Sequence, residues 1–198
     1  SGSMPYGQQH YPFENKELFE ANFPANFICE GLDQTRGWFY TLVVIAQALF
    51  DKPAFHNCVV NGLILAEDGK KMSKRLKNYP DPTKMLNQYG ADAIRLYMLN
   101  SPAVRGEDLR FSEKGLIETT RTLLLPLWNA LAFLTTYVRI DGWEPTSENL
   151  EIPRNNPLDR WILSKLVGLI DEVRTQMDLY DLNRSVAPFV GFIDLLTN

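Results

Sequence analysis

A long apolar run between two shorter ones most constrains how this chain can fold. The long run occupies residues 36–50, and its length favours a buried helix over a strand. Phe27-Ile28-Cys29 and residues 58–65 are short runs of the apolar and β-branched residues that strands prefer. Asp51-Lys52-Pro53 ends the helix. Strand, helix and strand together predict a βαβ unit with parallel strands and a right-handed crossover.

The segments on either side of this unit differ in character. Residues 1–27 show little periodicity and predict mostly loop. After the unit, Asp81-Pro82 is typical of a helix start, because aspartate caps the first turn and proline fits its first position. Gly90 is a plausible end for that helix, and a second short helix is expected over 91–99.

Beyond about residue 112 the apolar residues recur at helical spacing. One stripe runs from 116 to 138 and predicts a long helix with a kink at Pro126. A polar connection over 139–156 separates it from a second amphipathic helix over 158–177. A further helix is expected over 185–196.

These patterns predict an α/β part followed by an all-α helical segment, with the change near 100–112. The two strands look like half of a parallel sheet, and a helix pair with one apolar face cannot bury that face alone. We therefore expect the natural protein to continue past Asn198.

Composition indicates where the protein is located and whether it binds a membrane or a metal. No apolar stretch comes near the ~20 residues that span a bilayer, and the first residues do not resemble a signal peptide, so we expect no membrane and a cytoplasmic location. Cys29 and Cys58 predict reduced core thiols rather than a disulfide or zinc pair, and no metal site is visible. His10 and His56 are isolated and predict surface or loop positions.

Positive charge is concentrated in one loop of a chain whose net charge is −4. Residues 70–77 carry five basic side chains in eight positions, directly after the second strand. A lysine-rich loop at the end of a strand is suited to holding the charge of a polyphosphate. One phosphate-bearing ligand at one place fits this distribution better than a broad nucleic-acid surface.

A polar cluster follows the first strand, where open α/β sheets bind ligands. Gly31 would let a ligand approach the backbone, Asp33 could accept from ribose hydroxyls, and Gln34 offers a donor and an acceptor. Glu30 could hold an ammonium group, and Trp38 could wall an apolar pocket. Single residues of the cluster also have structural interpretations: Asp33 as a helix cap, Arg36 as part of a buried ion pair and Trp38 as core.

Together the two clusters resemble a known family. Gly31-Leu32-Asp33-Gln34-Thr35-Arg36-Gly37-Trp38-Phe39, followed by Asp68-Gly69-Lys70-Lys71-Met72-Ser73-Lys74-Arg75, is similar to the class I aminoacyl-tRNA synthetases. The first string resembles the isoleucine-specific enzymes, and residues 76–82 and 89–95 resemble their eukaryotic cytosolic type. The resemblance covers essentially the whole chain, including Ser1-Gly2-Ser3-Met4-Pro5-Tyr6.

The resemblance implies a fold, an activity and a set of residues. The fold would be the second half of a Rossmann-like, parallel-sheet nucleotide-binding fold (1–100), connecting helices (101–150) and the start of a helical anticodon-binding domain (151–198). The activity would use ATP, with Mg²⁺, to activate isoleucine and transfer it to tRNA(Ile). The residues implied are, for catalysis, Lys74, Lys71 and Ser73; for the adenylate and ATP, Glu30, Gly31, Asp33, Gln34, Gly62, Leu63 and Ile64; and for the amino-acid pocket, Trp38.

Two parts that the resemblance would require are not found in these residues. No His-x-Gly-His element occurs, and no editing domain is recognisable, so we expect the chain alone to be inactive. A non-catalytic synthetase-like module that binds RNA or protein is the alternative. A generic nucleotide-binding domain, whose basic loop is only a solvated turn, is a third.

Overall fold

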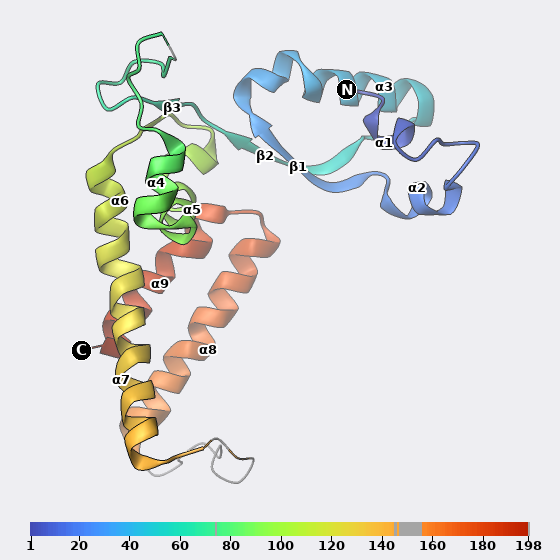
Figure 1. Ribbon diagram of the computed structural model, residues 1–198. Coiled ribbons are helices and arrows are strands. Elements are labelled where there is room, and N and C mark those ends of the chain that lie inside the picture. Colours follow the sequence, from blue (N-terminus) through green and yellow to red (C-terminus); the bar gives the residue numbers. More distant parts are fainter. Residues whose placement is uncertain (74, 145, 147–155, 198) are drawn as a thin grey trace. The chain divides into compact units, whose positions relative to one another are not determined.

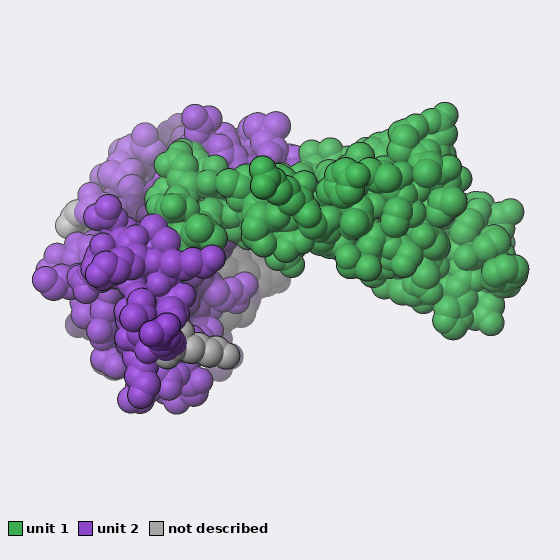
Figure 2. Space-filling model, turned by 90° about the horizontal axis from the view of Figure 1, so that it is seen from above, with its two compact units in different colours: residues 1–64, 102–109 green, residues 65–101, 110–198 purple. Residues whose placement is uncertain are grey.

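The computed structural model describes residues 1–73, 75–144, 146 and 156–197 of the chain (Figure 1). It divides into two compact units (Figure 2). Unit 1 contains Ser1–Ile64 and Pro102–Leu109, and unit 2 contains Leu65–Ser101 and Arg110–Asn198. The chain therefore passes between the units at three points, and the domain boundaries expected near 100 and 150 stay predictions.

Unit 1 contains the predicted strand–helix–strand unit. Strand β1 (Ala25–Gly31) pairs in parallel with β2 (Phe55–Asn61), and helix α3 (Trp38–Phe50) lies between them in sequence. The predicted parallel pairing is confirmed. The single strand expected over 58–65 is wrong, because β2 ends at Asn61 and a separate strand, β3 (Ile64–Leu65), follows.

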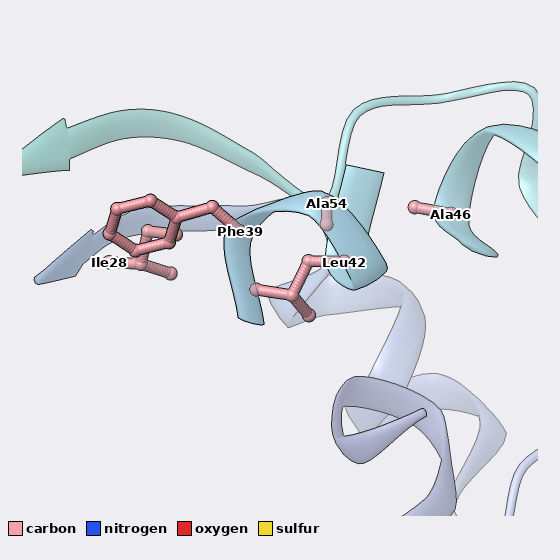
Figure 3. Packing of buried hydrophobic residues seen from close by; sticks show 5 residues of the cluster. All are labelled: Ile28, Phe39, Leu42, Ala46 and Ala54. Carbon is pink, nitrogen blue, oxygen red and sulfur yellow. The ribbon is translucent and has the colours of Figure 1, made fainter. Parts of the chain in front are cut away.

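Helix α3 packs one face against the β1–β2 sheet. Figure 3 shows the buried side chains that form this contact: Ile28, Phe39, Leu42, Ala46 and Ala54. The expectation of a buried helix holds for this face alone, because a two-stranded sheet covers one side of a helix. The apolar side chains of the other face are exposed: Tyr40, Val43, Val44 and Leu49.

The first residues are more ordered than the sequence predicted. Helices α1 (Met4–Gly7) and α2 (Lys16–Asn22) occupy part of the expected loop. Phe19 is buried, and its ring lies 4.8 Å from that of Phe23 and 5.3 Å from that of Phe50. Packing between aromatic rings distant in sequence stabilises helices too short for a periodic pattern to predict.

Unit 2 begins with the basic loop and two short helices that agree with the sequence. Helix α4 (Pro82–Tyr89) is capped by Asp81, whose side chain accepts the Thr83 N–H at 2.9 Å. Gly90 has a φ of +81°, which favours glycine, and α5 (Ala91–Leu99) follows it. Their predicted cap and stop are confirmed.

The long helix expected over 116–138 is present, with an interruption before Pro126. Helix α6 (Glu113–Thr119) continues through a π-helical turn (Thr120–Leu124) into α7 (Leu125–Asp141). Proline has no N–H for the helical ladder, and a π turn is one way to accommodate that loss.

This same helix, Glu113–Asp141, is long and apolar enough to cross a membrane by length and composition. The sequence-based expectation that no stretch comes near this length is wrong, because no charged residue lies between Arg121 and Arg139. A single helix of this kind is weak evidence for a membrane span.

Two further helices complete unit 2. Helix α8 (Pro157–Asp178) is capped by the Asn156 side chain, and α9 (Leu182–Thr197) contacts α8 and α7 (Figure 1). Both helices were predicted. Residue 145 and residues 147–155 of the expected connection lie outside the described residues. The remaining elements are two 3₁₀ turns and a short strand that pairs with β3: η1 (Leu32–Arg36), η2 (Pro102–Arg105) and β4 (Leu109–Arg110).

Candidate functional site

Strand pairing brings two of the predicted site segments to the same edge of unit 1. Glu30 lies opposite Val60 and Gly31 lies opposite Asn61, so both strands end together. Gly62 directly follows the end of β2, and the Glu30 side chain is exposed. The carboxyl ends of neighbouring parallel strands are where α/β sheets place ligands.

The 3₁₀ turn η1 carries Asp33 back over the strand end. A Cβ added to Gly31 would lie 2.7 Å from Asp33 Oδ1, so the missing side chain leaves room for the carboxylate. Gln34 Nε2 donates to Asp33 Oδ2 at 3.2 Å. The structure therefore brings Gly31, Asp33 and Gln34 into direct contact, with Asp33 exposed to solvent.

Gln34, rather than Asp33, caps the helix that follows. Its Oε1 accepts the backbone N–H of Trp38, the first residue of α3, at 2.9 Å. A Cβ on Gly37 would lie 2.8 Å from that oxygen, so Gly37 makes the cap possible. Sequence reasoning missed this role of Gly37. A glycine just before a helix, three residues after an amide side chain, was the available signal.

Trp38 lies half-buried beside an apolar cavity of about 320 Å³ in unit 1. Its indole N–H donates to the Ser1 carbonyl at 3.3 Å. The strand and helix contribute Ile28 and Leu42 to the wall, and the first 25 residues contribute much of the rest. The sequence did not predict these N-terminal lining residues, which include Met4, Pro5, Leu18 and Phe19.

The backbone at Gly62 and Leu63 is engaged by another part of unit 1. Gly62 N–H donates to the Ala103 carbonyl at 2.8 Å, and Leu63 N–H donates to Asp108 Oδ1 at 3.1 Å. A Cβ on Gly62 would lie 1.9 Å from the Glu107 carbonyl oxygen. Close packing against the Glu107 backbone thus requires glycine at position 62, a structural role that the sequence did not reveal.

The basic loop belongs to unit 2, and hydrogen bonds within the loop and to β3 fix its backbone. Lys71 forms an antiparallel bridge with Leu65, the last residue of β3, and the Asn78 side chain bonds to the backbone of Lys71 and Ser73. The Lys71 side chain is exposed. Lys74, predicted to be the principal catalytic lysine, lies outside the described residues.

The turn that enters this loop is fixed by an aspartate. Asp68 Oδ1 accepts the Lys70 N–H at 3.0 Å, and the Lys70 ammonium lies 3.2 Å from Asp68 Oδ2. These contacts, the backbone hydrogen bond first, lower the pKa of the Asp68 carboxyl. Gly69 has a φ of +79° and lies beside the Arg110 guanidinium.

The cysteines and histidines give no sign of a metal centre. Both cysteines are free thiols and exposed, so their predicted core position is wrong. Partial burial and the neighbouring Cys29 raise the pKa of the Cys58 thiol. His10 and His56 are exposed, as predicted. Within the part of the chain that the structure describes, no group of three His, Cys, Asp or Glu side chains could hold a metal ion.

Comparison with protein families gives a match to the model for tRNA synthetases class I (I, L, M and V) over residues 1–111. The chain is 64% identical, over its full length, to an isoleucine–tRNA ligase of Protochlamydia amoebophila. It is 54% identical over 209 aligned residues to the isoleucine–tRNA ligase of Treponema denticola. In both cases the whole chain is covered, and it spans 19% of the relative.

These two relatives are bacterial, so the expected eukaryotic cytosolic type is not supported.

A solved structure with a similar fold is the Mycobacterium tuberculosis methionyl-tRNA synthetase in complex with methionyl-adenylate, with a TM-score of 0.75 and 22% identity. That alignment covers 96% of this chain and 36% of the other. A LeuRS of Agrobacterium radiobacter in a complex with tRNA gives a TM-score of 0.73 at 21% identity, over 97% of this chain and 25% of the other. The predicted Rossmann-like fold followed by helices is confirmed at this level.

Proposed function

The chain belongs to the class I tRNA synthetases (I, L, M and V), and we propose that it forms part of an isoleucine–tRNA ligase. The reaction would activate isoleucine with ATP and transfer it to tRNA(Ile). The observation that carries the proposal is 54–64% identity to isoleucine–tRNA ligases over the whole chain. Because the chain spans 19% of these relatives, the complete reaction is proposed for a longer protein.

Activation joins the isoleucine carboxylate to the α-phosphorus of ATP and breaks the bond to the β-phosphate oxygen, so pyrophosphate leaves. Negative charge grows on the leaving group, and cations placed beside it lower the barrier. Lys71, Ser73 and Lys74 would supply this stabilisation, with Mg²⁺ bound by the phosphates. The Lys71 side chain is exposed, while its backbone is fixed by the bridge to Leu65 and by the hydrogen bond from Asn78. This combination supports the assignment.

The residues of unit 1 would bind the amino acid and the adenylate. Exposed Glu30 and Asp33 at the strand end suit an ammonium group and ribose hydroxyls. Gln34 keeps one free N–H after its bonds to Asp33 and Trp38, which leaves a donor for a ligand. The strand-end backbone over 62–64 would lie against the adenine through the flat faces of its peptide groups, because the Gly62 and Leu63 N–H groups and the Leu63 carbonyl are already bonded.

Trp38 would wall the pocket for the isoleucine side chain. The cavity beside it is lined mostly by apolar residues, with the amides Gln8, Gln9 and Asn22 among the others, and its volume of about 320 Å³ lies at the small end of ligand sites. Apolar walls from Ile28 and Leu42 suit a branched aliphatic group. A cytoplasmic location fits the free thiols and the assigned reaction.

A chimera tests the proposal. The matching stretch of the P. amoebophila ligase is replaced by this chain, and isoleucine-dependent exchange of pyrophosphate into ATP is measured. We expect exchange by the chimera, and Lys74→Ala should lower its rate by roughly 10²–10³-fold with little change in the isoleucine KM. Lys165→Ala, on helix α8, is the matched control and should leave the rate unchanged.

Two outcomes would count against the proposal. A folded chimera without exchange would favour the non-catalytic interaction module, and a rate insensitive to Lys74→Ala would favour a merely solvated loop. The 198-residue chain alone should charge no tRNA, and detectable charging would refute that expectation.

A further inference from the structure

The side chain of Asn78 closes the basic loop on itself. Its Oδ1 accepts the Ser73 N–H at 2.9 Å, and its Nδ2 donates to the Lys71 carbonyl at 3.2 Å. One neutral amide thus fixes the backbone on both sides of Met72. Asn78 and Ser73 are half-buried, which limits competition from water for the shorter of the two bonds.

Lys71 and Ser73, the two residues that Asn78 bonds, each make a further contact. Lys71 forms its antiparallel bridge with Leu65. The Ser73 carbonyl accepts the Lys77 N–H at 2.9 Å, and the Ser73 hydroxyl accepts the Arg75 N–H at 3.2 Å. The Asn78 amide therefore links a segment anchored to β3 with the turn that follows Ser73.

The backbone before Asn78 adopts a conformation that residues with side chains rarely take. Lys77 has a φ of +47°, in the left-handed region. Such a conformation persists where surrounding contacts hold it, and it is a reason to look for a role nearby. Here it turns the chain so that the side chain of the next residue reaches Ser73 and Lys71.

We propose that Asn78 is a positioning residue for the isoleucine-activation step, holding Lys71 and Ser73 where they meet the phosphates. The inference rests on the proposed function. Asn78 touches no substrate in this mechanism and acts through the backbone of the two residues that it bonds.

The chemistry of the amide explains why asparagine suits this position. The two bonds require one acceptor and one donor on a single short side chain, which asparagine provides. An aspartate could accept from Ser73 but could not donate to the Lys71 carbonyl. Its charge would also pair with a neighbouring lysine and reduce the positive potential that a phosphate needs. A neutral amide fixes the backbone of Lys71 and Ser73 without offsetting the charge of Lys71.

Amide hydrogen exchange in the 198-residue chain tests the structural half of the proposal. Asn78→Ala should accelerate exchange at Ser73 by roughly tenfold, because it removes the acceptor of that N–H. Exchange in α4 should stay the same. Asn78→Asp keeps the acceptor and should preserve the protection of Ser73. Asn156→Ala, which removes a comparable bond at the start of α8, is the matched control and should leave Ser73 unaffected.

Kinetics in the chimera test the catalytic half. Asn78→Ala should lower kcat for isoleucine-dependent exchange by roughly 10–100-fold, because small displacements of positioning groups are costly, and should leave the isoleucine KM unchanged. Asn78→Asp should also lower kcat although Ser73 stays protected. A merely structural role would instead lower the amount of folded enzyme and spare its kcat.

The outcomes separate this proposal from the one on which it rests. An unsubstituted chimera without exchange refutes the proposed function. An active chimera whose kcat changes less than twofold in Asn78→Ala refutes the role of Asn78 alone. Unchanged exchange at Ser73 in Asn78→Ala refutes the closed loop itself.

Discussion

Gly62→Ala separates a structural role of this glycine from a role in ligand binding. The added Cβ would lie 1.9 Å from the Glu107 carbonyl oxygen and 2.3 Å from its carbonyl carbon. Both atoms belong to backbone, so no side-chain rotation relieves the clash. An ordinary contact needs at least 3.4 Å, and the end of β2 must therefore move away from residues 102–108.

That movement breaks two hydrogen bonds. Gly62 N–H donates to Ala103 at 2.8 Å, and Leu63 N–H donates to the Asp108 carboxylate at 3.1 Å. A neutral bond contributes about 1 kcal/mol and one to a charged group about 1.5–3 kcal/mol, less where solvent reaches it. With partial relaxation of the clash, we expect the free energy of unfolding of unit 1 to fall by roughly 3 kcal/mol.

Urea unfolding followed by the fluorescence of Trp38 measures this change. The other tryptophans, Trp128, Trp143 and Trp161, belong to unit 2 and would be replaced by phenylalanine in both proteins compared. The matched control is Gly168→Ala in α8, where nothing lies within 4 Å of the added Cβ. The control lies in unit 2 and should leave the unfolding transition reported by Trp38 unchanged.

A loss smaller than about 1 kcal/mol in Gly62→Ala would refute the reasoning, because such a value is no larger than a typical surface effect. In that case a defect in the chimera would mean that Gly62 serves a ligand.

Three further predictions concern contacts of unit 2. Asp81→Ala should lower the free energy of unfolding by about 1 kcal/mol in urea unfolding, because it removes the cap of α4. The Tyr89 hydroxyl donates to Glu113, which raises the pKa of Tyr89. The contribution of this hydrogen bond to stability is present below pH ~10 and is lost as pH rises through the higher folded pKa. The difference in the free energy of unfolding between the parent and Tyr89→Phe should therefore shrink as pH rises through that pKa. The pKa of Asp68 is lowered, chiefly by the Lys70 N–H, so its contribution is present above pH ~4 and lost in more acid solution. The protection of the Lys70 N–H from hydrogen exchange, relative to its intrinsic rate, should therefore fall in acid in the parent but not in Asp68→Ala.

The sequence predicted elements whose signals are local. The cap at Asp81, the positive φ at Gly90 and the amphipathic pattern of α8 each depend on a few neighbouring residues, and the structure confirms them. The break between β2 and β3 depends on contacts with residues 102–108, which no local pattern reveals. The helices α1 and α2 likewise contact the distant ring of Phe50, through Tyr6 and Phe19.

The candidate site was predictable in residue type but not in the role of each residue. Strand ends and charge indicated Glu30, Asp33 and Lys71, whose side chains are exposed, and their roles in a site stay predictions. The use of Gln34 as a helix cap, and the backbone contact that explains Gly62, required the structure. Periodicity and charge report where a side chain could act, whereas hydrogen-bond partners report whether it is already engaged.

The two motifs share one arrangement of amides and charges. In unit 1, Gln34 bonds a backbone N–H and a neighbouring side chain, and in unit 2, Asn78 bonds a backbone N–H and a carbonyl. Beside them Glu30, Asp33 and Lys71 remain exposed. A neutral amide can satisfy a donor and an acceptor together without offsetting an adjacent charge, whereas a lysine at position 34 would offset Asp33 and an acid at position 78 would offset Lys71. Each motif thus gains a fixed backbone while its charge stays available to a ligand, and replacing either amide by its acid should disturb ligand binding more than it disturbs folding.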